Sequence, residues 1–108
     1  MPVQSVEKGS VFIVSISDRF SVEDSLEFGR TMKEAVKGES KTIIVVVAVT
    51  LINSHSLGTI FAGYREARQK EKTVKLVCDR PHSISALRRF DPSGSIAIFD
   101  TVEQALAG

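Results

Sequence analysis

Four polar residues in a row, Asn53, Ser54, His55 and Ser56, separate an apolar run (42–49) from the helical pattern that follows it. Each of the four side chains can form hydrogen bonds, whereas a helix start needs only one side chain to cap its free amides. We expect Ser54 or Ser56 to be that cap and Asn53 to shape the loop. The remaining polar groups could serve one of three further functions. They could provide a catalytic nucleophile, bind a metal, or form a surface that another protein binds and modifies.

A small serine hydrolase would use Ser54 as nucleophile, His55 or His82 as base, and Asp79 to orient that base. The side chains of adjacent Ser54 and His55 point apart, and His82 can approach Ser54 only if their two loops are neighbours. Ser54 also lacks the two flanking glycines of a nucleophile elbow. The sequence therefore gives catalysis little support, and we expect no enzyme.

Metal and cofactor sites have little support in the sequence. Two histidines without a carboxylate pair or thiolates nearby make a poor metal site. The chain contains no glycine-rich phosphate-binding loop, because Gly58 stands alone after the turn. We therefore expect neither a metal nor a cofactor.

A modification site fits the turn better. A serine at the start of a helix, beyond the end of a strand, is exposed and held in a fixed direction. A phosphate on Ser54 would be stabilised by the helix dipole and the free amides. It would also present about −1.5 to −2 charges to any protein bound there. The turn is thus a candidate binding surface that phosphorylation switches.

Composition indicates one soluble domain over residues 1–108, with 43% apolar and 25% charged residues and a net charge of +1. Basic and acidic residues are interleaved, which disfavours a nucleic-acid partner. The single cysteine, Cys78, cannot form an internal disulfide and lies in an apolar run, so we expect a buried, inert thiol in a reducing compartment. Without a leader or an apolar membrane-spanning stretch, we expect a cytoplasmic protein that does not insert directly into a membrane.

Hydrophobic periodicity predicts an alternation of strands and helices. Strands are expected at 3–6, 11–17, 42–49, 73–78 and 95–99, and helices at 21–37, 56–70, 83–90 and from about 101. Ser21 and Asp24 resemble a capping box at the first helix. One face of that helix carries Val22, Leu26, Gly29, Met32 and Val36. In the next helix the apolar face carries Leu57, Ile60, Phe61, Tyr64 and Ala67.

This order predicts an α/β fold with a mostly parallel sheet of four to five strands, an N-terminal hairpin and about four helices. The run 42–49 is β-branched almost throughout, so both faces of that strand should be covered. Functional groups in such sheets gather beyond the carboxyl ends of the strands. Both the 53–56 turn and the loop 78–83 should lie at that edge.

The element order, the β-branched strand and the segment INSHSLGTIFAGYREAR resemble the STAS domain of bacterial anti-sigma factor antagonists. Those proteins carry a turn of the form Asp-Ser-Ser/Thr-Gly-Leu-Gly before a helix, and residues 53–58 read Asn-Ser-His-Ser-Leu-Gly. The resemblance extends over nearly the whole chain, including DTVEQAL as a closing helix. Asn53 replaces the usual acid, His55 a small hydroxyl residue, and Ser56 a glycine.

The resemblance implies a regulator without catalytic activity of its own. It implies that the first serine of the turn, Ser54, is phosphorylated by an anti-sigma factor that is a histidine-kinase-like ATPase acting on serine. The unphosphorylated protein would bind that kinase and free a sigma factor, and phosphorylation would weaken the binding. The expected partner contacts are Asn53, Ser54, His55, Ser56 and Gly58.

Two arginines on the polar side of helix 56–70, Arg65 and Arg68, are further candidates for partner contact. They would bind an acidic surface of the partner. A solvated helix face explains them equally well. An alternative function is a STAS subunit that docks constitutively in a transporter or signalling assembly. The sequence leaves the sigma factor, the signal, the identity of the partner and the oligomeric state open.

Overall fold

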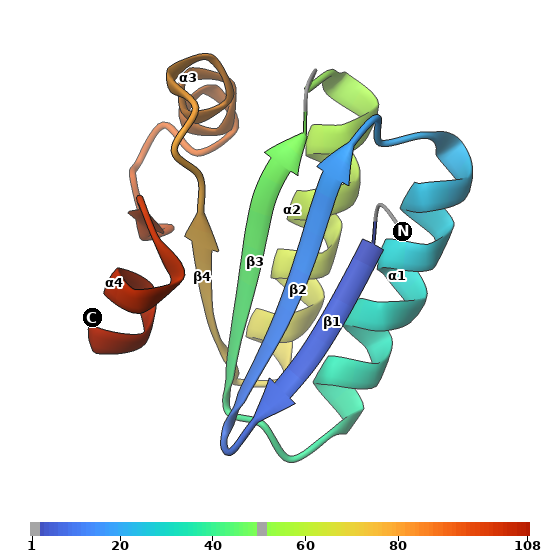
Figure 1. Ribbon diagram of the computed structural model, residues 1–108, viewed down its shortest axis with the longest axis vertical. Coiled ribbons are helices and arrows are strands. Elements are labelled where there is room, and N and C mark those ends of the chain that lie inside the picture. Colours follow the sequence, from blue (N-terminus) through green and yellow to red (C-terminus); the bar gives the residue numbers. More distant parts are fainter. Residues whose placement is uncertain (1–2, 50–51) are drawn as a thin grey trace.

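A computed structural model describes residues 3–49 and 52–108 and contains nine elements in the order β1–β2–α1–β3–α2–β4–α3–β5–α4 (Figure 1). The strands are Val3–Lys8 (β1), Val11–Asp18 (β2), Thr42–Val49 (β3), Thr73–Val77 (β4) and Ile98–Phe99 (β5). The helices are Val22–Lys37 (α1), Ser54–Gln69 (α2), Pro81–Phe90 (α3) and Val102–Ala107 (α4). The predicted α/β class and element order are confirmed.

The five strands form one sheet in the order β1-β2-β3-β4-β5. β1 pairs with β2 antiparallel through a turn at Gly9, whose φ of 59° suits a tight hairpin. The other neighbouring pairs are parallel. Because β2, β3 and β4 run in the same direction, their carboxyl ends lie at one edge of the sheet. The turn before α2 lies at this edge.

Helices cover both faces of the sheet. α1 and α2 run side by side behind it in Figure 1, and α4 packs against the other face. Side chains of the central strand alternate between the two cores. Val45 and Val47 enter the larger core, and Ile44 enters the smaller core with Ala105 of α4. The prediction that this strand is covered on both faces is confirmed.

The buried face of α1 differs from the apolar face that the sequence picked out. Met32 is buried, but Val22 and Leu26 are 66% and 61% exposed. Phe28 is fully buried and the helix is turned so that its ring enters the core. The buried residues of α1 are Ser25, Phe28, Thr31, Met32 and Ala35.

Two hydroxyl residues can occupy this buried face because each is satisfied within the helix. The Ser25 hydroxyl lies 3.2 Å from the carbonyl oxygen of Ser21, and the Thr31 hydroxyl lies 2.9 Å from that of Glu27. A hydroxyl bonded to a carbonyl one turn earlier loses little on burial. Apolar periodicity alone could not identify this face. Ser21 and Asp24 do form the predicted capping box.

The last strand is shorter than predicted, at 98–99 instead of 95–99. The Asp91 carboxylate accepts hydrogen bonds from the hydroxyls of Ser93 and Ser95 and from the backbone amide of Ile96. These bonds hold residues 91–96 as a loop. α3 starts earlier than expected, at Pro81, since proline suits the first position of a helix.

Candidate protein-binding site

The residue that caps α2 is Asn53, which the sequence analysis expected only to shape the loop. Asn53, with extended backbone angles, is the N-cap of α2, and its Oδ1 accepts a hydrogen bond of 2.9 Å from the backbone amide of Ser56. The prediction that Ser54 or Ser56 is the cap is therefore wrong. An amide oxygen at this position satisfies the same free donor as a serine hydroxyl, and α2 begins two residues earlier than expected.

Capping divides the turn into a buried and an exposed part. The Ser56 hydroxyl donates to Asn53 Oδ1 at 3.1 Å, and Ser56 is fully buried. Ser56 therefore supports the turn from inside and offers no side chain to a partner. Ser54 and His55 are exposed, as is Asn53. Gly58, one turn into α2, has open space where a Cβ would be.

His55 is exposed and also contacts α1. Its Nε2 lies 2.9 Å from the Oγ of Ser25. Because the Ser25 hydroxyl is also within reach of the Ser21 carbonyl, both bonds form when the imidazole N–H donates to Ser25 and Ser25 donates onward. The ring is thereby directed toward α1. No sequence signal marks this contact, since the two residues are 30 positions apart.

The arrangement required of a serine hydrolase is not present in residues 3–49 and 52–108. No hydrogen bond connects Ser54 with His55 or His82 there, and His55 is engaged by Ser25. The loop 78–83 does share the edge of the sheet with the turn, as predicted, because Arg80 Nη1 donates to the carbonyl oxygen of Val49 at 3.0 Å. The two loops are therefore close to each other, but their described residues do not form a nucleophile–base pair.

Cys78 follows β4 and is buried, as predicted. Desolvation by this burial raises the pKa of its thiol, which keeps it protonated and unreactive at neutral pH. The described parts of the chain contain no group of three or more His, Cys, Asp or Glu side chains placed to hold a metal ion. In the same parts, no helix is both long and apolar enough to cross a membrane.

Arg65 and Arg68 are exposed on α2, far from the turn. At a rise of 1.5 Å per residue they lie about 16 and 21 Å further along the helix than Ser54. A partner that contacts both the turn and these arginines must therefore cover most of the length of α2.

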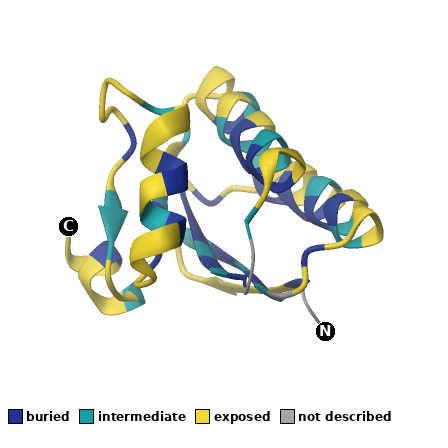
Figure 2. Ribbon diagram, turned by 90° about the horizontal axis from the view of Figure 1, so that it is seen from above, coloured by how far each residue is buried: buried dark blue, intermediate teal, exposed yellow. Residues whose placement is uncertain are grey.

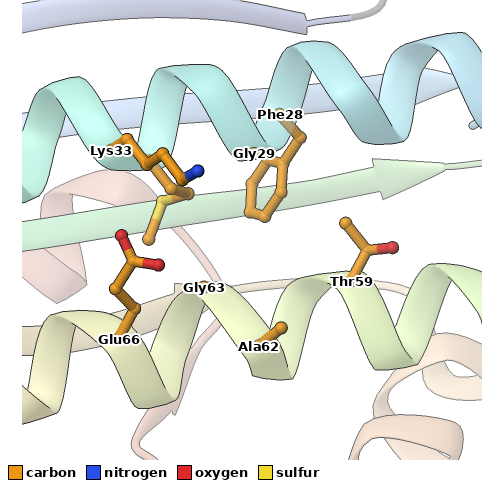
Figure 3. Close-up of a pocket in the computed structure, with 8 residues that line it drawn as sticks. Phe28, Gly29, Lys33, Thr59, Ala62, Gly63 and Glu66 are labelled. Atoms are coloured by element: carbon orange, nitrogen blue, oxygen red, sulfur yellow. The ribbon is translucent and has the colours of Figure 1, made fainter.

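A groove of about 210 Å³ runs between α1 and α2. Its floor includes Phe28, Met32 and Gly63, and the side chains of Lys33 and Glu66 face each other near one end (Figure 3). A Cβ on Gly63 would lie 3.2 Å from Met32 Cγ, so glycine lets the two helices approach closely. The sequence could not reveal this groove because its lining comes from two separate helices.

The family assignment rests on a match over almost the entire chain. The STAS domain description fits residues 2–105. The chain belongs to the STAS family. The turn at Asn53 and the α2 helix that it caps are therefore parts of a STAS domain.

Solved structures agree on the fold of this STAS domain. An anti-sigma factor antagonist from Mycobacterium paratuberculosis superposes with a TM-score of 0.82 at 17% identity, covering 97% of this chain and 90% of that one. The Bacillus cell fate determinant SpoIIAA in its phosphorylated form gives 0.75 at 16% identity, covering 97% and 96%. A STAS-domain anti-sigma-factor antagonist from Planctomyces limnophilus gives 0.78 at 14% identity, covering 97% and 95%. No curated protein matches the chain significantly.

Proposed function

We propose that this STAS domain is a regulator of the anti-sigma factor antagonist type, which acts by binding an anti-sigma factor in the cytoplasm. The observation that carries the proposal is the capped, exposed turn of Asn53, Ser54 and His55 at the carboxyl edge of the sheet. The Asn53 cap and the contact between His55 and Ser25 hold the turn in place. A partner would therefore bind a preformed surface. The fold neighbours named as anti-sigma factor antagonists support the type of partner.

The proposal includes Ser54 as a phosphate acceptor for a partner that is a histidine-kinase-like ATPase acting on serine. Of the two serines in the turn, Ser54 is exposed and Ser56 is buried. The first turn of α2 contains no acidic residue, whereas α1 has Glu23 and Asp24 there. A phosphate on Ser54 would thus meet the positive end of the α2 dipole without a carboxylate in that turn. It would repel any acidic group of a docked partner.

A second candidate is constitutive docking in a transporter or signalling assembly. All three residues that depart from the family turn, Asn53, His55 and Ser56, are used in hydrogen bonds within the domain. The turn is therefore fixed without any modification. In this function the same surface binds its partner at all times, and Ser54 contributes a contact without a switch.

Co-purification of the tagged chain from its native cell, followed by mass spectrometry, tests both candidates. We expect an anti-sigma factor among the bound proteins and phosphate on Ser54. Ser54→Asp should weaken binding of the recovered partner by roughly 2–5 kcal/mol, while Ser85→Asp, at an exposed serine of α3, should not.

Three outcomes separate the functions. If Ser54→Asp binds as the parent does and the chain carries no phosphate, constitutive docking is the function. Phosphate mapped to another residue of the turn would remove Ser54 from its proposed role. Turnover of generic ester or phosphoester substrates, lost in Ser54→Ala, would identify an enzyme instead. Reversal of both Arg65 and Arg68 to Glu tests separately whether the interface reaches along α2.

A further inference from the structure

An exposed aromatic ring lies at the junction of α2 and α3. Phe90, at the end of α3, is 49% exposed, and its ring stacks on that of Phe61 in α2 with centroids 5.5 Å apart. Arg65 follows Phe61 by about one helical turn, and Arg89 precedes Phe90 in the chain. We call Arg65, Arg68, Arg89 and Phe90 the aromatic–arginine face.

The arginines of this face have no acidic partner in the described parts of the chain. The ion pair found there lies within α1, and the guanidinium groups of Arg65, Arg68 and Arg89 donate no hydrogen bond. Glu66 lines the groove toward α1 (Figure 3), and the Asp91 carboxylate is held by Ser95 and by the Ile96 amide. In the described residues these three arginines therefore carry positive charge without an ion-pair partner, on the two helices whose rings Phe61 and Phe90 stack.

A face of opposite character lies on the first half of α1. Val22 and Leu26 are the most exposed large apolar side chains of the described residues. Their i,i+4 spacing places them on one side of the helix. Glu23 is exposed beside them, and the first turn of α1 is acidic. We call Val22, Glu23 and Leu26 the acidic–aliphatic face.

We propose that the occupant of the aromatic–arginine face is the acidic–aliphatic face of a second copy of this chain. Phe90 of one copy would pack between Val22 and Leu26 of the next, and its arginines would approach Glu23. A net charge of +1 opposes this association only weakly. α1 and α3 lie on opposite sides of α2 (Figures 1 and 2), so one molecule cannot join its own two faces.

The contact is head-to-tail because it joins two different faces. Repetition of such a contact gives a ring or an open chain of subunits. Ser25, which contacts His55 of the turn, lies between Val22 and Leu26 in sequence. Ser21, directly before α1, lines a pocket together with Asn53, so a second copy on the first half of α1 would lie next to the turn and compete with a partner there. The proposal goes beyond the function proposed above and needs no partner protein for its test.

Sedimentation equilibrium of the purified chain provides that test. In low salt, about 0.02 M, we expect the average mass to rise above 11.8 kDa as the protein concentration approaches about 1 mM. In about 0.5 M salt the mass should fall toward that of the monomer because the ion pairs are screened. Val22→Ser with Leu26→Ser, and Arg65→Glu with Arg89→Glu, should each remain monomeric. Leu106→Ser, which alters an exposed leucine of α4, should associate like the parent.

Mixing the two blocked variants is the decisive measurement. Each keeps one intact face, so a head-to-tail contact predicts a 1:1 heterodimer and nothing larger. A monomeric parent at every concentration and salt would overturn the proposal, as would a mixture that stays monomeric although the parent associates. A monomeric parent that binds vesicles of phosphatidylserine through Arg65 and Arg89 would assign the face to a membrane and also overturn it. Circular dichroism of each variant checks that it is folded.

Discussion

The side chains of Ser25 and His55 meet between α1 and α2, with Oγ and Nε2 2.9 Å apart. Ser25 is buried on α1, whereas His55 is exposed in the first turn of α2. The bond therefore connects the exposed turn to the buried face of a different helix. It fixes the orientation of the His55 ring relative to α1, which is a structural role for this side chain.

A double-mutant cycle measures this contact. His55→Ala should lower the free energy of unfolding by about 0.5–1.5 kcal/mol, the usual value of one hydrogen bond. Ser25→Ala should cost at least as much because it also removes the bond to the Ser21 carbonyl. In urea unfolding the double variant should cost less than the sum of the two. Strict additivity would mean that the two side chains do not interact. Tight, stoichiometric zinc binding lost in His55→Ser would contradict the structural role.

Replacing the cap tests the assignment of Asn53. Asn53→Ala should destabilise the domain by about 1 kcal/mol for the lost cap. The buried Ser56 hydroxyl would also lose its acceptor, at a cost of about 1–3 kcal/mol. Ser54→Ala should change stability by less than about 0.5 kcal/mol, and Asn53→Asp should restore most of the loss because a carboxylate accepts the same bonds. A larger loss for Ser54→Ala than for Asn53→Ala would return the cap to Ser54.

Two glycines of the α1–α2 groove should respond differently to alanine. Gly29 has open space around a Cβ, so Gly29→Ala should stabilise α1 by about 0.5–1 kcal/mol. On Gly63 a Cβ would lie 3.2 Å from Met32 Cγ and 3.3 Å from Phe28 Cε2. Gly63→Ala should stabilise the domain much less than Gly29→Ala or not at all. The new methyl group would press on the buried Phe28 ring, which cannot move freely, and this cost would offset the gain in helix stability. Equal thermal stabilisation by both would mean that the helices are not closely packed at Gly63.

The sequence predicted the sheet well because its signal is local and redundant. The β-branched run 42–49 identifies a covered strand without reference to the rest of the chain, and Val45 and Val47 are indeed buried. The apolar face predicted for α2 is also buried at Leu57, Ile60, Phe61 and Ala67, whereas the buried face of α1 was harder to predict. α1 buries Ser25 and Thr31 and exposes Leu26, because hydroxyls satisfied within a helix can enter a core. Apolar periodicity does not contain that information.

The candidate site was located by sequence, but its internal bonds were not. A polar turn beyond a buried strand indicates the edge of the sheet, and the turn lies there. The choice among Asn53, Ser54 and Ser56 as cap depends on backbone angles at one residue. The contact of His55 with Ser25 depends on how two helices pack. Neither follows from residue types and spacing within the turn.

Val45→Asp tests the central strand. Val45 is 1% exposed between β2 and β4, where no charged partner could reach a carboxylate. An unpaired charge there should destabilise the domain by several kcal/mol. The matched change Thr73→Asp, at the exposed first residue of β4, should have a much smaller effect. If Val45→Asp melts at the temperature of the parent, β3 is not the buried centre of the sheet.

The Asp91 loop should make stability depend on pH in acid. Hydrogen bonds from the Ile96 amide, and then from the hydroxyls of Ser95 and Ser93, hold the pKa of the Asp91 carboxyl below its ordinary value of 3.8. The unfolded chain therefore binds this proton more readily, so the stabilisation is complete above the unfolded pKa and disappears as pH falls through the lower, folded pKa. Asp91→Asn should lower stability at neutral pH and flatten the decline below about pH 4. Asp79→Asn is the matched control, because Asp79 is exposed and accepts no hydrogen bond from the residues that the structure describes. Thermal unfolding of both variants is measured from pH 7 to pH 3. If the stability of Asp91→Asn falls with pH as steeply as that of the parent, Asp91 is not the source of the acid sensitivity.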